Sequence, residues 1–432
     1  MRRRVTKVIS VFPVWAWVLG IFIAGFSLRL ILLLVVEPLQ PGVPVGEINH
    51  IAHSLAFSGR YADAYGIGSG PTAHDVPLYP FILAIFIRSF GEGAAGEIAI
   101  RVLTAAGASV AYALLPYLSE LALSDAAPGV LAGAVGALLP LTLWTFIAGT
   151  NQPIAAGVMV ALAILFIIVQ QPRRSFAWTL LLGIAAGLSC LFSAPFLTVF
   201  GMSAITAFVL RPKGQRLARV FAVVGVCIVV ALAPWAIRNK LALGRMIWTR
   251  SNFGTDFAQS NNNDASPDLN DLINSTKWHH PLYDDEERRK ITEMGECAYN
   301  DAKLATAIAW IKSNPARFVT LSAERALLFW FPLRNGVART VIGDAESLLG
   351  LLGLALLLIR RHPQAWLFLG MLVGYFGVFC LVTADPRYSF PVEPLLLLLG
   401  AYFLADRVGA LAAHAHDARQ GAPLSTDQAA AS

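Results

Sequence analysis

Ten long runs of apolar residues restrict this chain of 432 residues to the folds available to a membrane protein. Hydrophobic residues make up 56% of the sequence and charged residues only 14%, which is too apolar for a water-soluble globule. About 20 apolar residues cross the hydrocarbon core of a bilayer as one helix. The sequence therefore predicts an all-α, polytopic fold with about ten transmembrane helices, at 13–36, 98–122, 129–149, 153–170, 176–192, 195–210, 218–237, 341–359, 365–383 and 388–405.

Two further apolar runs are less regular, and the basic residues of the chain indicate where they lie. Residues 77–90 begin with two prolines and would reach only about 21 Å as a helix, whereas residues 316–333 are interrupted by charged side chains. If neither run crosses, all the basic turns fall on one side, which the excess of Lys and Arg in cytoplasmic loops identifies as the cytoplasm. We expect both termini in the cytoplasm and both runs to form interfacial helices on the outer face. The basic segments concerned are 2–4, 173–174, 211–219 and 360–361.

This topology gives the expected domain organisation. The segment 284–311 predicts one charged helix with a solvated face. The short cytoplasmic tail has the composition of a disordered segment. The expected parts are an N-terminal transmembrane module with an outer loop at 37–97 (1–237), a periplasmic segment with an interfacial helix (238–337), C-terminal transmembrane helices (338–406) and the tail (407–432).

The first outer loop contains most of the residues that could catalyse a reaction or bind a ligand. Glu47, His50 and His53 follow one another at a spacing of three residues, so a short helix would place them on one broad face. They could supply a general base or the ligands of a divalent cation. The sequence identifies no other cofactor. Equally, they could form the polar face of an interfacial helix.

The second half of the loop adds an acid and aromatic rings. His74 and Asp75 precede Pro77, at the start of the run 77–90. At this position the charged side chain of Asp75 faces water or a ligand. Tyr61 and Tyr65 could stack on a sugar ring, although tyrosines are also common at membrane interfaces. Tyr79 is a further candidate for substrate binding.

Other polar residues lie at the outer ends of the predicted spans. Arg238, beside Asn239, and Arg387 could bind a lipid phosphate through charge-assisted hydrogen bonds, or extend to headgroups. Gln152 stands at another outer corner. The formal charge of +6 comes from arginines at the ends of spans, so no nucleic-acid partner is expected. The sequence contains no nucleotide-binding motif.

Four segments in order resemble the bacterial branch of the glycosyltransferase C superfamily, which includes protein O-mannosyltransferase-like and aminoarabinose-transferase-like enzymes of the family 39 type. The resemblance extends from Val14 to Phe403. It is carried by GPTAHDVPLYPFILAIF, by PWAIRNKLALGRMIW with the Asn-rich turn that follows, by AWIKSNPARFVTLSAERALLFWF and by RYSFPVEPLLLLLGAY.

The resemblance implies an inverting membrane glycosyltransferase. The donor would be a sugar on a polyprenyl phosphate in the bilayer of the bacterial inner membrane, and the acceptor a lipid, glycan or protein on the periplasmic face. Glu47 or Asp75 would act as base, while Arg238 and Arg387 would hold the departing phosphate. These groups should then line a single outward-facing cavity.

The chain departs from the family pattern at several positions. Pro44 stands where the family usually has an aspartate, Gln152 where it often has an acid, Ala194 where it often has an arginine, and Asp75 where an arginine precedes the PLYP run. Three alternatives stay open: an active transferase, a catalytically degenerate relative that binds a lipid or a partner, and a transporter. A shared fold does not decide among them.

Overall fold

The computed structural model describes residues 12–36, 46–138, 151–171, 174–210, 215–275, 279–332 and 337–420. Within these ranges the chain is helical apart from its connections, and its β structure is limited to isolated bridges. The predicted all-α class is therefore confirmed. The apolar helices make the chain a multi-pass membrane protein.

The N-terminal half supplies most of the bundle. The predicted interfacial run 77–90 forms the 13-residue helix α4, and residues 139–149 of the third predicted span lie outside the described residues. The helices are α2 (Val14–Ile31, continued by a π-helical turn at Leu32–Val36), α3 (Glu47–Ser58), α4 (Leu78–Phe90), α5 (Ala94–Ala113), α6 (Leu115–Leu123), α7 (Ala127–Leu138), α8 (Gln152–Gln170), α9 (Phe176–Phe192), α10 (Phe196–Leu210) and α11 (Gln215–Leu243).

The C-terminal half begins with short polar helices and returns to the bundle. The second predicted interfacial run forms α16. The elements are α12 (Phe253–Ser260), α13 (Leu269–Asn274), α14 (Asp285–Met294), α15 (Glu296–Ser313), α16 (Pro315–Trp330), α17 (Val337–Ile359), α18 (Ala365–Phe379), the 3-10 turn η3 (Pro386–Ser389) and α19 (Glu393–Gln420).

Small residues let the bundle helices approach closely. α9 packs on α11, α10 on α18 and α17 on α19. A Cβ atom on Gly183 would lie 2.6 Å from the sulfur of Cys227, and one on Gly353 would lie 2.0 Å from the carbonyl oxygen of Leu399. Larger side chains at these glycines would push the helices apart.

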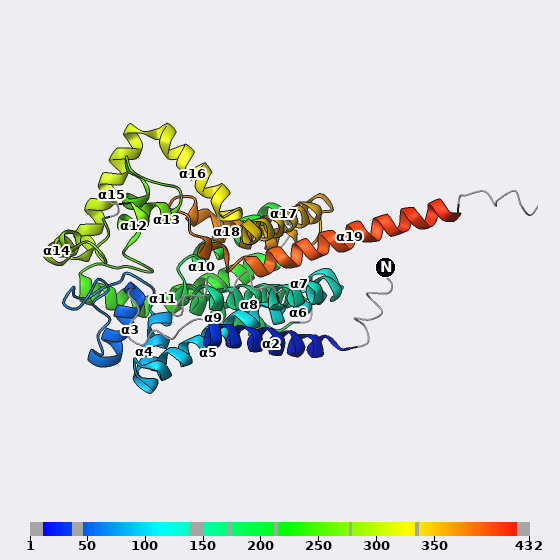
Figure 1. Cartoon of the computed structure of the whole chain (residues 1–432), viewed down its shortest axis with the longest axis horizontal. Helices are drawn as coiled ribbons and strands as arrows, with labels where there is room; N and C mark the ends of the chain where they lie inside the picture. Colours follow the sequence, from blue (N-terminus) through cyan, green and yellow to red (C-terminus); the bar gives the residue numbers. More distant parts are fainter. Residues whose placement is uncertain are drawn as a thin grey trace, which may run out of the picture.

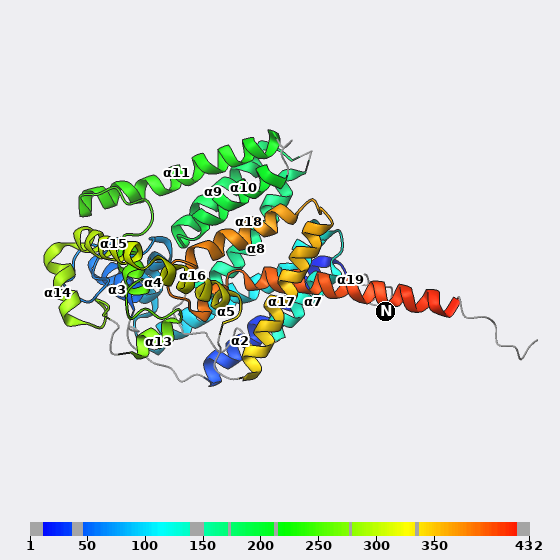
Figure 2. The same cartoon turned by 90° about the horizontal axis from the view of Figure 1, so that it is seen from above.

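The polar helices gather at one end of the molecule. Helices α3, α12, α14 and α15 lie together at the left of Figure 1, whereas α19 extends to the opposite end (Figure 1). The view from above shows the same separation, with the turn between α17 and α18 at the far end from α14 (Figure 2). The first outer loop and the segment after α11 thus meet at one end of the bundle.

Two expectations about the polar regions need correction. The charged helix expected at 284–311 is two helices, because Gly295 has a φ of 78° and turns the chain between α14 and α15. This break directs Glu296 inward, toward the first outer loop. Residues 407–420, expected in a disordered tail, continue α19, and residues 421–432 lie outside the described residues.

Candidate active site

The outer loop between α3 and α4 is a compact structure that its own side chains build. Asp63 has a φ of 66°, and its Oδ1 accepts hydrogen bonds from the amides of Gly68 and Gly70 at 3.1 and 3.2 Å. Both glycines also have positive φ, which residues with a side chain rarely adopt. The turn returns the chain so that Ala62 and Pro71 form an isolated bridge.

Two side chains from later segments, Arg238 and Glu296, bind this loop to the rest of the molecule. Arg238 donates from Nη1 to the carbonyl of Thr72 at 2.6 Å and from Nη2 to the carbonyl of Tyr61. The buried Glu296 accepts from the Ala73 amide at 2.8 Å and from the hydroxyls of Thr72 and Ser251. Hydrogen bonds to a charged acceptor are the stronger kind, so the loop has a fixed position.

The fixed loop brings Asp75 next to Arg250. Nε of Arg250 lies 3.6 Å from Oδ1 of Asp75 and donates to the carbonyl of His74 at 3.1 Å. Asp75 is 6% exposed, and Oδ1 also accepts from the Val76 amide at 2.8 Å. The positively charged guanidinium of Arg250 therefore lies against His74 and Asp75 of the loop.

Two further carboxylates lie within range of that charge. Oε1 of Glu47, at the start of α3, lies 3.5 Å from Nε2 of His280. Asp256, on α12, accepts from Nδ2 of Asn252 at 2.8 Å. The charge of Arg250 acts on both Glu47 and Asp256. Glu47, Asp75, Asp256, Arg250 and His280 are called the outer cluster below.

Burial sets the protonation of the outer cluster. Burial raises the pKa of Asp75 and of Glu47, with Arg250 acting in the opposite direction. For Asp256, burial outweighs the positive charge of Arg250 and raises the pKa to about 6. Burial also lowers the pKa of His280 to about 4, so this imidazole is neutral at pH 7. At that pH Asp256 is an ionised carboxylate of unusual basicity.

The two arginines predicted to bind phosphate differ in their surroundings. Arg238 is fully engaged by the loop carbonyls and by Oδ1 of Asn239 at 3.0 Å. Arg387 forms a two-pronged pair with Asp385, from Nε at 2.9 Å and from Nη2 at 3.0 Å, and its side chain is 33% exposed. Its charge reaches Glu47. Of the two, Arg387 is the one that borders the outer cluster.

The three candidate metal ligands on α3 do not converge. Glu47 faces His280, the Nδ1 of His50 lies 3.2 Å from the carbonyl oxygen of Ala64, and Nε2 of His53 lies 3.2 Å from Oε1 of Glu92. No group of three or more His, Cys, Asp or Glu side chains in the described part of the chain could hold a metal ion. In this structure the three side chains therefore have separate partners.

The other predicted residues mostly support the fold. His74 shares a hydrogen bond of 3.0 Å with Tyr65, and burial lowers its pKa well below the usual value. Tyr61 donates to the carbonyl of Asp75 at 2.9 Å. The remaining three are Tyr79, whose buried ring packs on Phe192, Asn239, which donates to the carbonyl of Ile247, and Gln152, which accepts from the hydroxyl of Tyr375.

Comparison with solved structures places this geometry on a known scaffold. The chain is similar to the oligosaccharyltransferase AglB from Archaeoglobus fulgidus, solved with an inhibitory peptide and a dolichol-phosphate, at 15% identity and a TM-score of 0.53 over 95% of this chain and 52% of AglB. The apo form of that enzyme gives 14% identity and a TM-score of 0.54 over 94% and 52%. This chain therefore shares the fold of that oligosaccharyltransferase, as the resemblance to the glycosyltransferase C superfamily predicts.

The structural match covers only part of the proteins compared. The chain spans about half the length of the oligosaccharyltransferase. ArnT from Cupriavidus metallidurans, solved with undecaprenyl phosphate, matches at 14% identity over 90% of this chain and 78% of ArnT, with a TM-score of 0.39. No family model and no curated protein sequence matches the chain.

On this glycosyltransferase C fold, sequence reasoning missed the residues contributed by the segment after α11. Arg250, Asp256 and His280 lie at least 170 positions after Asp75 in the chain, and none belongs to a motif with diagnostic spacing. The available signal was local: Arg250 lies two residues after the end of PWAIRNKLALGRMIW, and His280 lies in a Trp-His-His-Pro turn. Only the folded chain shows that Arg250 pairs with Asp75 and that its charge also acts on Asp256.

Proposed function

We propose that this protein is a membrane glycosyltransferase that moves a sugar from a polyprenyl-phosphate donor to a lipid, glycan or protein acceptor on the periplasmic face of the bacterial inner membrane. The observation that carries the proposal is the outer cluster, in which three carboxylates share the charge of Arg250 at one end of a glycosyltransferase C fold. AglB and ArnT were solved with polyprenyl-type lipid phosphates. Such a donor enters from the bilayer and needs no nucleotide pocket.

The proposed reaction is a single displacement with inversion. A carboxylate takes the proton of the acceptor hydroxyl while the oxygen attacks the anomeric carbon, and the bond from that carbon to the phosphate oxygen breaks. Arg250 and Arg387 stabilise the negative charge of the departing phosphate. Both arginines already carry an acidic partner, Asp75 and Asp385 respectively, which fixes their orientation.

Two carboxylates can act as the base. Asp256 is placed first, because its pKa of about 6 leaves it ionised yet basic near neutral pH. Glu47 is the second candidate, since its side chain is 23% exposed and lies beside the neutral His280. Asp75 is buried against Arg250, so it acts as a positioning residue for that guanidinium.

The test uses the full chain in nanodiscs and a panel of polyprenyl-phosphate sugars. We expect transfer by the wild type, a loss of about 10²–10⁴-fold in the variant that lacks the base, and partial activity in Asp75→Asn. The variants Asp256→Asn and Glu47→Gln decide between the two bases. Asp264→Asn, on an exposed residue of the same segment, is the matched control. Loss of transfer in neither variant, with an active wild type, would remove both residues as the base.

Binding of the lipid phosphate is tested separately from chemistry. Undecaprenyl phosphate should bind more tightly than undecaprenol to the wild type, and Arg250→Met and Arg387→Met should remove that difference. Arg245→Met is the control, because Arg245 pairs with Asp301 on the exposed surface. Equal binding of the phosphate and the alcohol would count against the proposal.

A second function is favoured by the ion pairs themselves. Because Arg250 and Arg387 are both already neutralised by aspartates, a catalytically degenerate relative could bind a lipid or a partner protein without transferring a sugar. Phosphate-dependent lipid binding in the absence of transfer from every donor of the panel would identify this function.

A further inference from the structure

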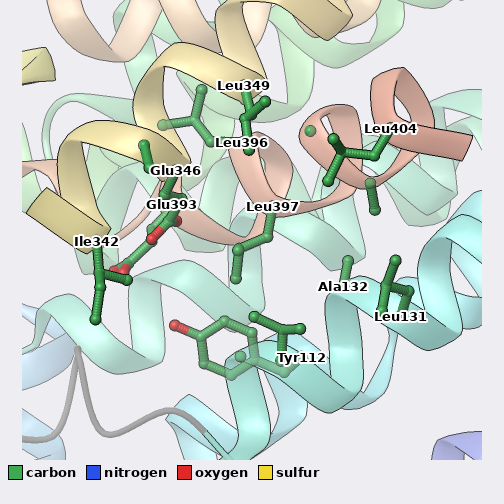
Figure 3. Close-up of a pocket in the computed structure, with 15 residues that line it drawn as sticks. Tyr112, Leu131, Ala132, Ile342, Glu346, Leu349, Glu393, Leu396, Leu397 and Leu404 are labelled. Atoms are coloured by element: carbon green, nitrogen blue, oxygen red, sulfur yellow. The ribbon is translucent and has the colours of Figure 1, made fainter. Parts of the chain in front are cut away.

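Carboxylates lie near an arginine at two places in the molecule, and one of these places is inside the bundle. A cavity of about 260 Å³, called the membrane cavity below, is bordered by α5, α7, α17 and α19 and lined mostly by aliphatic side chains (Figure 3). Glu346 and Glu393 project into it beside the ring of Tyr112. The guanidinium of Arg29 lies 4.9 Å from the centre of that ring, and its charge acts on Glu393. The other place is the outer cluster, where a histidine of fixed orientation faces an acid.

The turn before α14 holds His280 in a fixed position. The amide of Asp284 donates to the carbonyl of His280 at 2.8 Å. Arg288, on α14, donates from Nε to the carbonyl of Pro281 at 3.1 Å and from Nη2 to the carbonyl of Leu282 at 2.7 Å. These hydrogen bonds bind the turn to the helix that follows it, so the imidazole of His280 has little freedom to move.

The same turn determines which ring nitrogen of His280 carries the proton. Nδ1 accepts a hydrogen bond of 3.1 Å from the backbone amide of Leu282. An amide N–H can only donate, so Nδ1 presents a lone pair and the single proton of the neutral imidazole is on Nε2. Nε2 lies 3.5 Å from Oε1 of Glu47. The neutral His280 therefore presents one N–H donor to Glu47.

We infer that His280 is a positioning residue, which holds the carboxylate of Glu47 in one orientation as the acceptor for a hydroxyl group of the substrate. The inference rests on the proposed function. His280 is 5% exposed, whereas the side chain of Glu47 is 23% exposed, so a substrate reaches the carboxylate and not the imidazole. A separation of 3.5 Å is long for a hydrogen bond, and such contacts in active sites tighten when the substrate is bound. Because the imidazole is neutral, it orients the carboxylate without cancelling its negative charge.

The first measurement follows Glu47 itself and requires no sugar transfer. Infrared titration of the full chain in nanodiscs gives the pH at which Glu47 is half protonated, with its C=O band assigned by the loss of that band in Glu47→Gln. His280→Asn keeps an acceptor for the Leu282 amide but is too short to donate to Glu47. This midpoint should rise by about one pH unit in His280→Asn, because a donor to the ionised form is lost.

Two further variants separate the donor from the turn. His280→Gln restores an N–H near the position of Nε2 and should return the midpoint to the wild-type value. The control is His279→Asn, because His279 is 63% exposed and pairs with Asp284; it should leave the midpoint unchanged. The charges of Arg250, His50 and Asp75 also act on Glu47, but they are the same in all these variants.

Sugar transfer then tests the role of His280 in the reaction. His280→Asn should lower kcat/KM about tenfold or more, His280→Gln should recover most of the activity, and His279→Asn should match the wild type. Thermal unfolding verifies each variant, and His280→Ser, which also lacks a donor that reaches Glu47, takes the place of an Asn variant that does not fold. An unchanged midpoint or unchanged transfer in the folded variant would overturn the inference, as would a rise of the midpoint that His280→Gln does not reverse. A wild type that transfers sugar from no donor would contradict the proposed function, whereas the infrared midpoints would still show whether His280 donates to Glu47.

Discussion

The outer cluster and the membrane cavity both set carboxylates near an arginine, but they differ in what the arginine contacts. In the outer cluster Arg250 lies 3.6 Å from an acid and acts on two more. In the bundle Arg29 is held by three backbone carbonyls and lies over an aromatic ring. Arg250 donates a hydrogen bond to the carbonyl of His74 but also pairs with a carboxylate, which a phosphate could replace. Arg29 donates to carbonyls on two helices and so joins them.

This difference assigns separate ligands to the two regions. The outer cluster is built from loops and short helices that are fastened by Arg238 and Glu296, so it can admit a polar acceptor from water. The membrane cavity is built from long helices and aliphatic side chains, so it can admit only molecules that partition into lipid.

The largest combined effect, on the transfer rate and on stability together, is expected for Arg250→Met. Losing this guanidinium removes a stabilising charge for the departing phosphate, which corresponds to about 10²–10³-fold in the transfer rate. It also leaves Asp75 buried without its cation, which lowers stability because a broken buried pair costs about 3–5 kcal/mol. Transfer assays and thermal unfolding in nanodiscs measure the two effects.

The conservative variant separates these contributions. Arg250→Lys keeps a cation near Asp75 and should restore most of the thermal stability. Lysine lacks the planar geometry that binds a phosphate, so this variant should transfer sugar at least tenfold more slowly than the wild type. If Arg250→Met transferred sugar at the wild-type rate, Arg250 would be a framework residue like Arg29, and the distinction between the two regions would fail.

The next effect is the pH dependence that Asp256 gives to transfer. The base must be ionised, and burial raises the pKa of Asp256 to about 6, so kcat/KM should fall as the pH decreases through about 6. Asp256→Asn should remove this acidic limb and lower the rate about 10²–10⁴-fold at pH 7.5. The measurement is kcat/KM from pH 5 to 8 for the wild type and both base variants.

The outcome also decides between the two candidate bases. If Asp256→Asn retains the acidic limb and Glu47→Gln loses it, Glu47 is the base and Asp256 serves only to hold Arg250. A limb that persists in both variants would contradict the assignment of either carboxylate.

A smaller effect is expected where the loop is fastened. Glu296 accepts hydrogen bonds from Thr72, Ala73 and Ser251. Glu296→Gln would replace one of the two carboxylate oxygens with an amide NH₂ group, which cannot accept from these donors. Each buried group left without a partner costs about 1–3 kcal/mol. We expect faster amide exchange in residues 61–75 and a raised KM with little change in kcat. Glu293→Gln, on an exposed neighbour, should alter neither.

Much of the fold could be predicted from the sequence, because apolar runs of sufficient length have few alternatives in a membrane protein. The predicted span 153–170 corresponds to α8, and 176–192 to α9. The errors lie in polar segments, where periodicity is a weaker guide: Gly295 breaks the charged helix and orients Glu296. A glycine with positive φ cannot be distinguished from a tolerated helical glycine by sequence pattern alone.

The candidate site was predictable only on the side of the first outer loop. Glu47 and Asp75 stand out because they are acids in an apolar chain, and the structure brings both to Arg250. Arg238 has the same apparent signal at the end of a span, yet the loop carbonyls engage it. Whether an arginine binds a ligand or a loop depends on contacts across more than 160 positions of the chain, which local sequence does not encode.

The smallest effect concerns stability, and it follows from the burial of Asp256. Its pKa is about 6 in the folded protein against an ordinary value of 3.8, so the folded state holds the proton more tightly than the unfolded state. Its contribution to stability is therefore fully present below pH 4 and is lost as the pH rises from about 4 to about 6. Asp256→Asn lacks this loss, so its Tm relative to the wild type should rise over that interval and then stay constant. A functional carboxylate commonly lowers stability in this way. The control Asp264→Asn, on the exposed surface, should show no such dependence of Tm on pH. If the difference in Tm between Asp256→Asn and the wild type were independent of pH, Asp256 would be ionised as easily in the folded chain as in water.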